Sequence, residues 1–248
     1  MMKQFVVALA LAGVLAGGQP SSALVGSSRS GDRFAAHTVM VLNRTQSAAG
    51  FCTGVVIARD VVLTAAHCVI GAAGLRVLAG EGQPVELLEV ESAVTHPEFR
   101  PDAPRTRQRS IDLALIRMKQ PLPSRLSPAT IDPQPSIAVG SRFNIAGYGI
   151  AVEGDERSAG KLREGELVAR APLSSILLWA EDLNRKGFGA CTGDSGGPVF
   201  SADGTRVVAI TAWSTGAGKK HCGALTQATL IAPQSKWIDG VLAAWGAR

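Results

Sequence analysis

The sequence predicts an all-β protein whose last element is a helix, and three observations support this. After position 23 the apolar residues fall into short runs rich in Val, Ile and Leu, at the length of β-strands. Gly, Pro, Asn or Asp separates most of these runs, as in a sandwich or barrel. Near the C-terminus the apolar spacing becomes that of a helix over residues 233–245, with an apolar face formed by Trp237, Ile238, Val241, Leu242 and Trp245.

The expected strands lie in both halves of the chain. They cover residues 37–42, 53–58, 61–66, 75–80, 85–92, 113–118, 142–149, 165–171, 197–200 and 206–213. Residues 173–186 are an equivocal second helical candidate, with Ser174 or Ser175 as N-cap. Residues 121–136 contain five prolines and are the best candidate for a connection between two halves.

The first 23 residues have the layout of a secretory signal peptide. Lys3 precedes an apolar run over residues 5–15, and small residues stand at Ser21 and Ala23. The run is too short for a permanent membrane span. We therefore expect residues 1–23 to be removed. The remainder is then a secreted, soluble monomer, periplasmic or extracellular, without membrane contact.

The formal net charge of +5 is mild, and basic residues are mixed with acidic ones except in one cluster. This cluster, "FRPDAPRTRQRS" (residues 99–110, here called the basic loop), contains Arg100, Arg105, Arg107 and Arg109. Its prolines and its lack of periodicity predict a solvated loop. No aromatic residues interleave the arginines, so we expect no nucleic-acid partner.

Four cysteines in an exported chain predict two disulfides, with three pairings open. The local pairing joins Cys52 to Cys68 and Cys191 to Cys222, and it closes one short loop in each half. A zinc site is the alternative, but the chain has no C-x-x-C pair. We expect neither a metal nor a cofactor.

Three segments carry residues suited to nucleophilic catalysis. His67 lies in "LTAAHC", directly after an apolar strand, and Asp112 in "SIDLALIRM" enters another. A buried carboxylate needs a partner, and His67 Nδ1–H is a suitable one. Ser195 lies in "GDSGGP", and a serine hydroxyl attacks only when an oriented base takes its proton. The glycines allow the N–H groups of Gly193 and Ser195 to converge on the oxyanion of a tetrahedral intermediate.

The motifs "LTAAHC", "DLALI" and "CTGDSGGP", in this order, resemble the chymotrypsin/trypsin-like serine endopeptidases. The resemblance extends over nearly all of residues 24–245. It implies two six-stranded antiparallel β-barrels, at about 24–125 and 136–232, followed by the helix at 233–245. It also implies a peptide or protein substrate and a catalytic triad of Ser195 as nucleophile, His67 as base and Asp112 as its orienting group.

The resemblance also assigns Asp194 a role outside the reaction itself. In the family this aspartate pairs with a newly formed N-terminal amine and so orders the oxyanion hole. Here the matching start is Leu24-Val25-Gly26, directly after the predicted signal peptide. We expect signal cleavage to free Leu24 in one step; cleavage after Ala16 is the competing site and leaves a short propeptide.

Substrate preference is expected to depart from that of trypsin. The resemblance places Gly189, Ala190, Trp213, Ser214 and Thr226 at the pocket for the residue before the scissile bond. Gly189 occupies the position at which an aspartate, in related enzymes, favours Arg or Lys substrates. Ser214 and Thr226 place side chains at the two walls, which shorten the pocket. This predicts cleavage after small aliphatic residues such as Ala or Val. A separate departure is Ala212, which replaces a serine that in many relatives donates to the triad aspartate.

Alternative functions remain open at this stage. The sequence also matches the α/β-hydrolase motif G-x-S-x-G, but that fold needs its Asp and His after the serine and an alternation of strands and helices. A catalytically silent relative that serves as a binding protein is a second alternative, although no triad member is missing. A regulatory protease with one target is a third. The Ala-rich, Lys-poor composition weakly favours a bacterial source.

Overall fold

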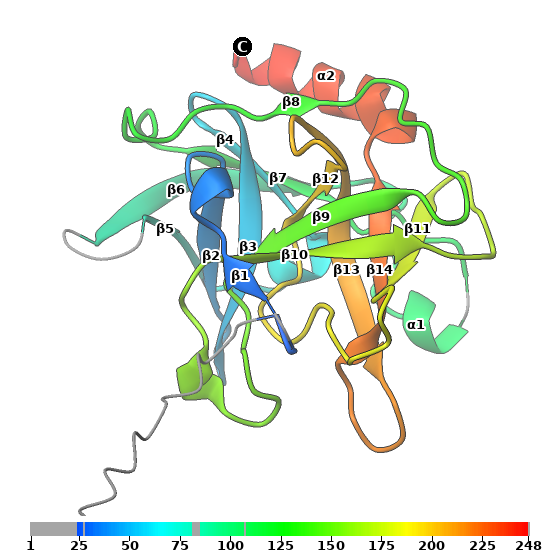
Figure 1. The fold of residues 1–248 in the computed structure, drawn as a ribbon. Helices are drawn as coiled ribbons and strands as arrows, with labels where there is room; N and C mark the ends of the chain where they lie inside the picture. Colours follow the sequence, from blue (N-terminus) through cyan, green and yellow to red (C-terminus); the bar gives the residue numbers. More distant parts are fainter. Residues whose placement is uncertain (1–23, 27, 81–84, 107, 248) are drawn as a thin grey trace, which may run out of the picture.

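The computed structural model describes residues 24–26, 28–80, 85–106 and 108–247, and the predicted signal peptide lies outside these residues. The described chain forms two β-barrels side by side, with one longer helix across the top of the view in Figure 1. Ten of its strands overlap the ten apolar runs, whose Val, Ile and Leu side chains are mostly buried. No helix in the described part is long and apolar enough to cross a membrane.

The first barrel closes in the order β2-β3-β4-β7-β6-β5, and all neighbouring strands are antiparallel. Closure leaves no free edge, so every strand has two partners. Its strands are β2 (Thr38–Arg44), β3 (Ala49–Ala58), β4 (Val61–Thr64), β5 (Gly74–Ala79), β6 (Glu86–Thr95) and β7 (Ala114–Met118).

The second barrel has the order β10-β11-β14-β13-β12-β9, and pairing between β9 and β10 closes it. Its strands are β9 (Arg142–Gly147), β10 (Arg163–Ala169), β11 (Leu177–Glu181), β12 (Pro198–Ser201), β13 (Arg206–Gly216) and β14 (Gly223–Leu230). Two short strands extend the sheet: β1 (Arg29–Ser30) pairs with β10, and β8 (Thr130–Ile131) runs parallel to β13. The prediction of two six-stranded antiparallel barrels is confirmed, with β8 as an added parallel strand.

The two barrels share a buried interface. The rings of Phe34 and Phe200, one from each half of the chain, stack with centroids 4.0 Å apart. Phe34 ends the short 3₁₀ helix η1 (Asp32–Phe34), and Phe200 lies in β12. This contact fixes the second barrel against the segment that leads into the first.

The predicted C-terminal helix is present as α2 (Ser235–Trp245), which follows the 3₁₀ turn η4 (Ala232–Gln234). It packs on the first barrel, where the Trp237 ring lies edge-on to His96 with centroids 4.7 Å apart. The other short helices are η2 (Ala66–Cys68), α1 (Ala103–Thr106) and η3 (Glu156–Ser158). The boundaries predicted for the two barrels, about 24–125 and 136–232, stay predictions. Among the described residues, β8 is the only strand that lies between the two barrels in the sequence.

The equivocal prediction of a helix at residues 173–186 is wrong, because this segment contains strand β11 (Leu177–Glu181). Leu177 pairs with Thr229 of β14, and burial alternates along the strand, with Leu178 and Ala180 buried. The local sequence fits a helix, but pairing with β10 and β14 decides the outcome. Strand β14 itself was not predicted, because its Gly, Ala and Thr residues form no apolar run.

The structure has the local disulfide pairing, Cys52–Cys68 in the first barrel and Cys191–Cys222 in the second. All four cysteines are therefore used. The first disulfide joins β3 to η2, and the second joins the loop before β12 to Cys222, the residue directly before β14.

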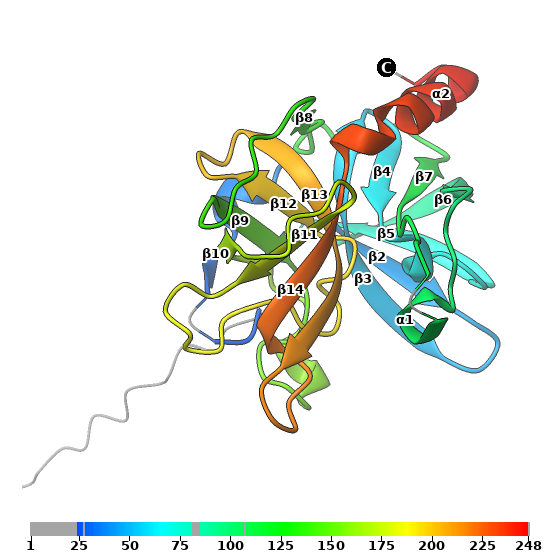
Figure 2. The ribbon, with the colours of Figure 1, turned by 90° about the vertical axis from the view of Figure 1, so that its right-hand side faces the viewer.

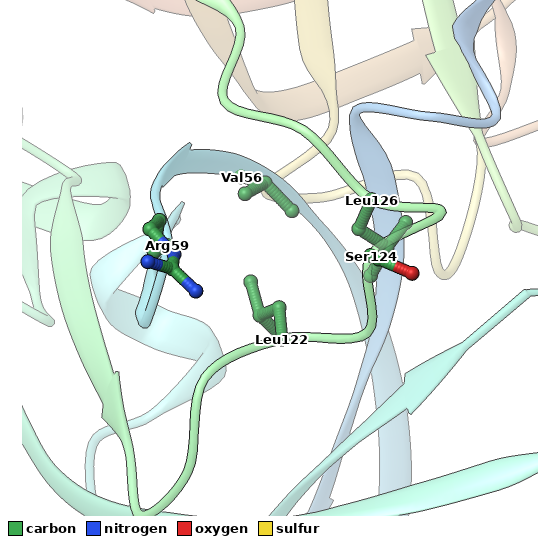
Figure 3. Close-up of a pocket in the computed structure, with 5 residues that line it drawn as sticks. All are labelled: Val56, Arg59, Leu122, Ser124 and Leu126. Carbon is green, nitrogen blue, oxygen red and sulfur yellow. The ribbon is translucent and has the colours of Figure 1, made fainter.

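A pocket of about 260 Å³ lies at the β3–β4 turn of the first barrel (Figure 3). Its lining consists of Val56, Arg59, Leu122, Ser124 and Leu126. None of the predicted catalytic residues lines this pocket, so it is separate from the site described next.

Candidate active site

His67 lies on the short turn η2, immediately after strand β4 ends at Thr64. The neighbouring Cys68 is joined to Cys52 of β3, so the turn is covalently tied to the barrel wall. Asp112 precedes β7, between Ile111 and Leu113, which are both fully buried. Both side chains are therefore held by buried segments, while the His67 side chain keeps 40% of its surface exposed.

The Asp112 carboxylate accepts two hydrogen bonds from one residue. His67 Nδ1 lies 2.7 Å from Asp112 Oδ2, and the backbone N–H of His67 donates to Oδ1 at 3.0 Å. An ionised carboxylate can only accept, so the proton of the ring lies on Nδ1. The lone pair of Nε2 is then free to act as a base. With Ala212 in place of a serine, the described partners of this carboxylate come from His67 alone.

Ser195 comes from the second barrel and lies against the segment that carries His67. Its carbonyl oxygen accepts the N–H of Thr53 at 2.8 Å and lies 3.8 Å from Cys68 Sγ. A Cβ on Gly196 would overlap the carbonyl oxygen of Thr53 and Oγ1 of Thr64, so the loop needs glycine for this close approach. Among the described residues the Ser195 hydroxyl has no hydrogen bond to His67. Such bonds often tighten only when substrate is bound.

The two predicted oxyanion donors, the N–H groups of Gly193 and Ser195, have no partner among the described residues. Gly193 has φ of +93°, a left-handed conformation that disfavours other residues. Its carbonyl oxygen accepts a hydrogen bond from Thr53 Oγ1 at 2.9 Å, and this Oγ1 in turn accepts the N–H of Tyr148 at 3.0 Å. The loop is therefore turned so that its free N–H groups are available to a ligand.

Asp194 is buried, with only 1% of its surface exposed. Its two carboxylate oxygens accept the N–H groups of Gly149 and Cys191, each at 2.9 Å. Burial raises the pKa of Asp194 to about 7, although both N–H groups and the charge of Arg163 act against this rise. The buried carboxyl thus lacks the stabilisation that its ionised form requires.

The predicted activation residue Leu24 is also buried, with 1% of its surface exposed in the core of the second barrel. Val25 forms a β-bridge with Gly189, whose N–H donates to the Val25 carbonyl at 3.2 Å. The described hydrogen-bond partners of Asp194 do not include Leu24. The N-terminal segment therefore lies beside the predicted substrate pocket, without an observed pair to Asp194.

Four of the predicted pocket residues lie together, because Ser214 of β13, Ala190 and Gly189 all adjoin Thr226 of β14; Trp213 precedes Ser214 in β13. Ser214 pairs with Thr226 across the two strands. Thr226 is 2% exposed, and its Oγ1 accepts the N–H of Ala190 at 3.1 Å. A Cβ on Gly189 would lie 3.3 Å from the same Oγ1, so the Thr226 side chain occupies space beside the predicted base. Trp213 is 49% exposed at the rim.

Sequence analysis missed the role of Thr53. This residue is fully buried in β3, and its backbone and side chain together contact Ser195, Gly193 and Tyr148. Its position in "FCTG" gave no signal, because each residue that it contacts is distant from it in the sequence.

A cluster that could suggest a metal site is formed by His67 and the sulfurs of Cys52 and Cys68, which lie near one another. Because these sulfurs form a disulfide, they offer no thiolate to a metal.

The chain is similar to a curated protein and to a solved structure. Vitamin K-dependent protein C of Rattus norvegicus is 29% identical over 222 residues, which are 77% of this chain and 46% of the relative. The chain thus spans about half the length of this curated relative. A solved structure of neuropsin, a serine protease expressed in the limbic system of mouse brain, matches 82% of this chain and 93% of its own. Its TM-score is 0.66 at 24% sequence identity, so it supports the fold alone.

The family model for trypsin matches residues 25–238, from the segment after Leu24 into helix α2. This range contains both barrels, the His67–Asp112 pair and the Ser195 loop. The chain belongs to the trypsin family.

Proposed function

We propose that this protein is a serine endopeptidase, with Ser195 as nucleophile, His67 as general base and Asp112 as the group that orients it. The observation that carries the proposal is the pair of hydrogen bonds from His67 to Asp112, which leaves Nε2 without a described partner, while the Ser195 carbonyl lies 3.8 Å from Sγ of the neighbouring Cys68. In trypsin-like chemistry this lone pair removes the serine proton.

The proposed reaction follows from these positions. As Ser195 Oγ attacks the peptide carbonyl, its proton passes to His67 Nε2, and the N–H groups of Gly193 and Ser195 bind the developing oxyanion. The imidazolium, stabilised by Asp112, then protonates the leaving amine, and an acyl-enzyme forms. Water attacks this ester by the same route in reverse, which releases the acid and restores Ser195.

The proposed substrates carry a small aliphatic residue, such as Ala or Val, before the scissile bond. Support comes from the buried Thr226 side chain beside Gly189 and from Ser214 on the opposite strand, which together shorten the pocket. Gly189 provides no carboxylate for Arg or Lys. One methylene more or less in such a pocket changes kcat/KM by about 10- to 200-fold.

We also propose that the protein is exported and that cleavage before Leu24 activates it. The two disulfides are typical of an oxidising compartment. A free amine on Leu24 supplies the cation that the buried Asp194 carboxylate requires. N-terminal sequencing of the exported, active protein is expected to give Leu24 as the first residue; an active form with another start contradicts one-step activation.

The test of activity is a peptide library varied at the residue before the scissile bond, with Ser195→Ala as the inactive control. We expect cleavage after Ala and Val, and labelling of wild type but not Ser195→Ala by a serine-reactive phosphonate. Replacing Thr226 and Ser214 by Gly is expected to shift the preference toward larger residues. An unlabelled wild type that binds peptides without cutting them identifies a silent relative instead.

A further inference from the structure

The turn η2, which carries His67, is too short to fix its own position. It has three residues, and its hydrogen bonds within the turn run from the N–H groups of residues 68–70 to the carbonyls of Ala65 and Ala66. A 3₁₀ turn of this length has few bonds and poor hydrogen-bond geometry. The position of the His67 side chain therefore depends on the contacts that η2 makes with the rest of the first barrel.

Two polar side chains from outside η2 bind its backbone at and after His67. One is Asp112, whose Oδ1 accepts the N–H of His67 at 3.0 Å. The other is Asn43, whose Nδ2 donates to the carbonyl oxygen of Cys68 at 2.9 Å. Among the described residues no other group donates to this carbonyl. The sequence pointed to Asp112, and the contact of Asn43 becomes visible only in the structure.

The alternation of side chains along β2 explains why Asn43 reaches η2. Val39 and Val41 belong to the apolar cluster that also contains Cys52 and Cys68. Successive side chains of a strand point to opposite faces, so Asn43 is the next member of this row. It is half-buried near the end of the strand. A polar side chain in such a row needs a hydrogen-bond partner, and the carbonyl of η2 provides it.

Gly50 provides the space for this amide. Strands β2 and β3 lie side by side in the first barrel (Figure 2), and Asn43 pairs with Gly50 across them. A Cβ on Gly50 would lie 2.7 Å from Asn43 Oδ1, which is too close for an undisturbed side chain. Gly50 does not have a positive φ, so its backbone conformation is open to other residues. Glycine is therefore needed here for the room that the Asn43 side chain takes.

We propose that Asn43 is a positioning residue for the peptidase reaction, because its amide holds the Cys68 carbonyl and so fixes the turn that presents His67 to Ser195. Asn43 acts through η2 and does not touch the substrate. Asp112 orients the imidazole ring, and Asn43 fixes the backbone that carries this ring. The proposal rests on the endopeptidase activity proposed above and adds a second group to the alignment of its base.

The expected effect is moderate, because the turn keeps its other attachments. A displacement of about 1 Å can slow an enzyme by about 10²-fold, but the Cys52–Cys68 disulfide limits how far η2 can move. Loss of one neutral hydrogen bond changes an equilibrium by about threefold to tenfold. We therefore expect Asn43→Ala to lower kcat by about threefold to tenfold. KM should stay near its original value, since the proposed pocket lies in the second barrel.

The experiment measures peptide hydrolysis for three variants, each normalised to active sites titrated with the phosphonate. Asn43→Asp keeps the shape but replaces the donor by an acceptor, so kcat should fall at least as far as in Asn43→Ala. Gly50→Ala keeps the amide but displaces it. It should lower kcat on its own and add little to Asn43→Ala, where the overlap no longer exists. Because Gly50 is exposed, its variant tests the proposal even if removal of the amide prevents folding.

A spectroscopic measurement follows the base itself. The proton between His67 Nδ1 and Asp112 Oδ2, which are 2.7 Å apart, lies in a charge-assisted hydrogen bond and is observed by proton NMR. If Asn43 fixes the turn, this proton should exchange with solvent faster in Asn43→Ala than in wild type. A residue that contributes only to overall stability would not change this exchange under conditions where the protein is fully folded.

Asn144 of β9 offers a matched control in the second barrel. Its Nδ2 donates to the carbonyls of Ser201 and Ala202, both at 3.0 Å, so it makes the same kind of bond away from η2. Asn144→Ala is expected to lower the thermal stability while kcat and the exchange of the Nδ1 proton stay unchanged.

Several outcomes overturn the proposal. A loss of kcat in Asn43→Ala without one in Asn43→Asp shows that the side chain only fills space. Additive effects of Asn43→Ala and Gly50→Ala, or an unchanged Nδ1 proton, show that the loss does not arise through η2. An active wild type whose kcat is unchanged in all three variants rejects the positioning role and leaves the endopeptidase standing. Absence of hydrolysis and of phosphonate labelling in wild type rejects the endopeptidase, and this role of Asn43 with it.

Discussion

Two carboxylates on opposite barrels, Asp112 and Asp194, show how the same side chain is used in two ways. Each accepts two N–H groups at 2.7 to 3.0 Å. Asp112 keeps 19% of its side chain exposed and faces a histidine that can take up a proton. Asp194 is enclosed, and burial raises its pKa to about 7 although the two backbone N–H groups oppose the rise. The two carboxylates accept the same number of hydrogen bonds and differ in their access to solvent.

The largest effect is expected at Asp112. Asparagine can keep the shape of the side chain, but its amide presents N–H to the ring and favours the wrong tautomer of His67. We expect Asp112→Asn to lower kcat by about 10⁴-fold with little change in thermal stability. Peptide hydrolysis and thermal unfolding measured on the same preparation check this. A loss of less than tenfold would mean that Asp112 does not orient the base.

The pair His67–Asp112 also shows what could be predicted from the sequence. Both residues, the Ser195 loop and ten strands were found from short motifs and apolar runs, because those signals are local. The strand at residues 177–181 was not predicted, since the apolar spacing there fits a helix. Only the pairing with β10 and β14 makes this segment a strand. Thr53 was missed for the same reason: its role comes from contact with Gly193, 140 residues away.

The second prediction concerns the pH dependence of stability caused by Asp194. Folding raises this pKa from 3.8 to about 7, so the fold favours the protonated carboxyl. Its contribution is fully present below about pH 4 and is lost as the pH rises through about 7. In Ser195→Ala protein that still carries residues before Leu24, we expect the free energy of unfolding to fall by up to about 4 kcal/mol over this range.

Urea unfolding between pH 4 and 8 measures this change, with Asp194→Asn as the variant that abolishes it. Asp203 provides a matched control, because hydrogen bonds from Ser201 and Thr205 lower the pKa of this exposed carboxyl. Its contribution has the opposite sign, so Asp203→Asn leaves the fall caused by Asp194 in place. In protein that begins at Leu24, pairing with the new amine is expected to remove the fall. The same pH dependence with and without the free amine would contradict that pairing.

The smallest of these effects is expected at Thr53, which joins the Ser195 loop to the first barrel. Replacing Thr53 by Val keeps the shape but leaves the Gly193 carbonyl and the Tyr148 N–H without their partner in a fully buried position. Unpaired buried groups of this kind destabilise by about 1 to 3 kcal/mol. Because the Gly193 peptide also loses its support, we expect kcat to fall while KM stays near its original value.

Thr229 offers a matched control for this prediction. It is equally buried, but its hydroxyl has no hydrogen-bond partner within the described part of the chain. Thr229→Val should therefore be neutral or slightly stabilising, since it removes a polar group that is already unpaired. Urea unfolding and steady-state hydrolysis of the two variants, measured side by side, separate a hydrogen-bond effect from a general effect of threonine replacement in the core. Equal behaviour of the two would show that Thr53 does not support the oxyanion donors through its hydroxyl.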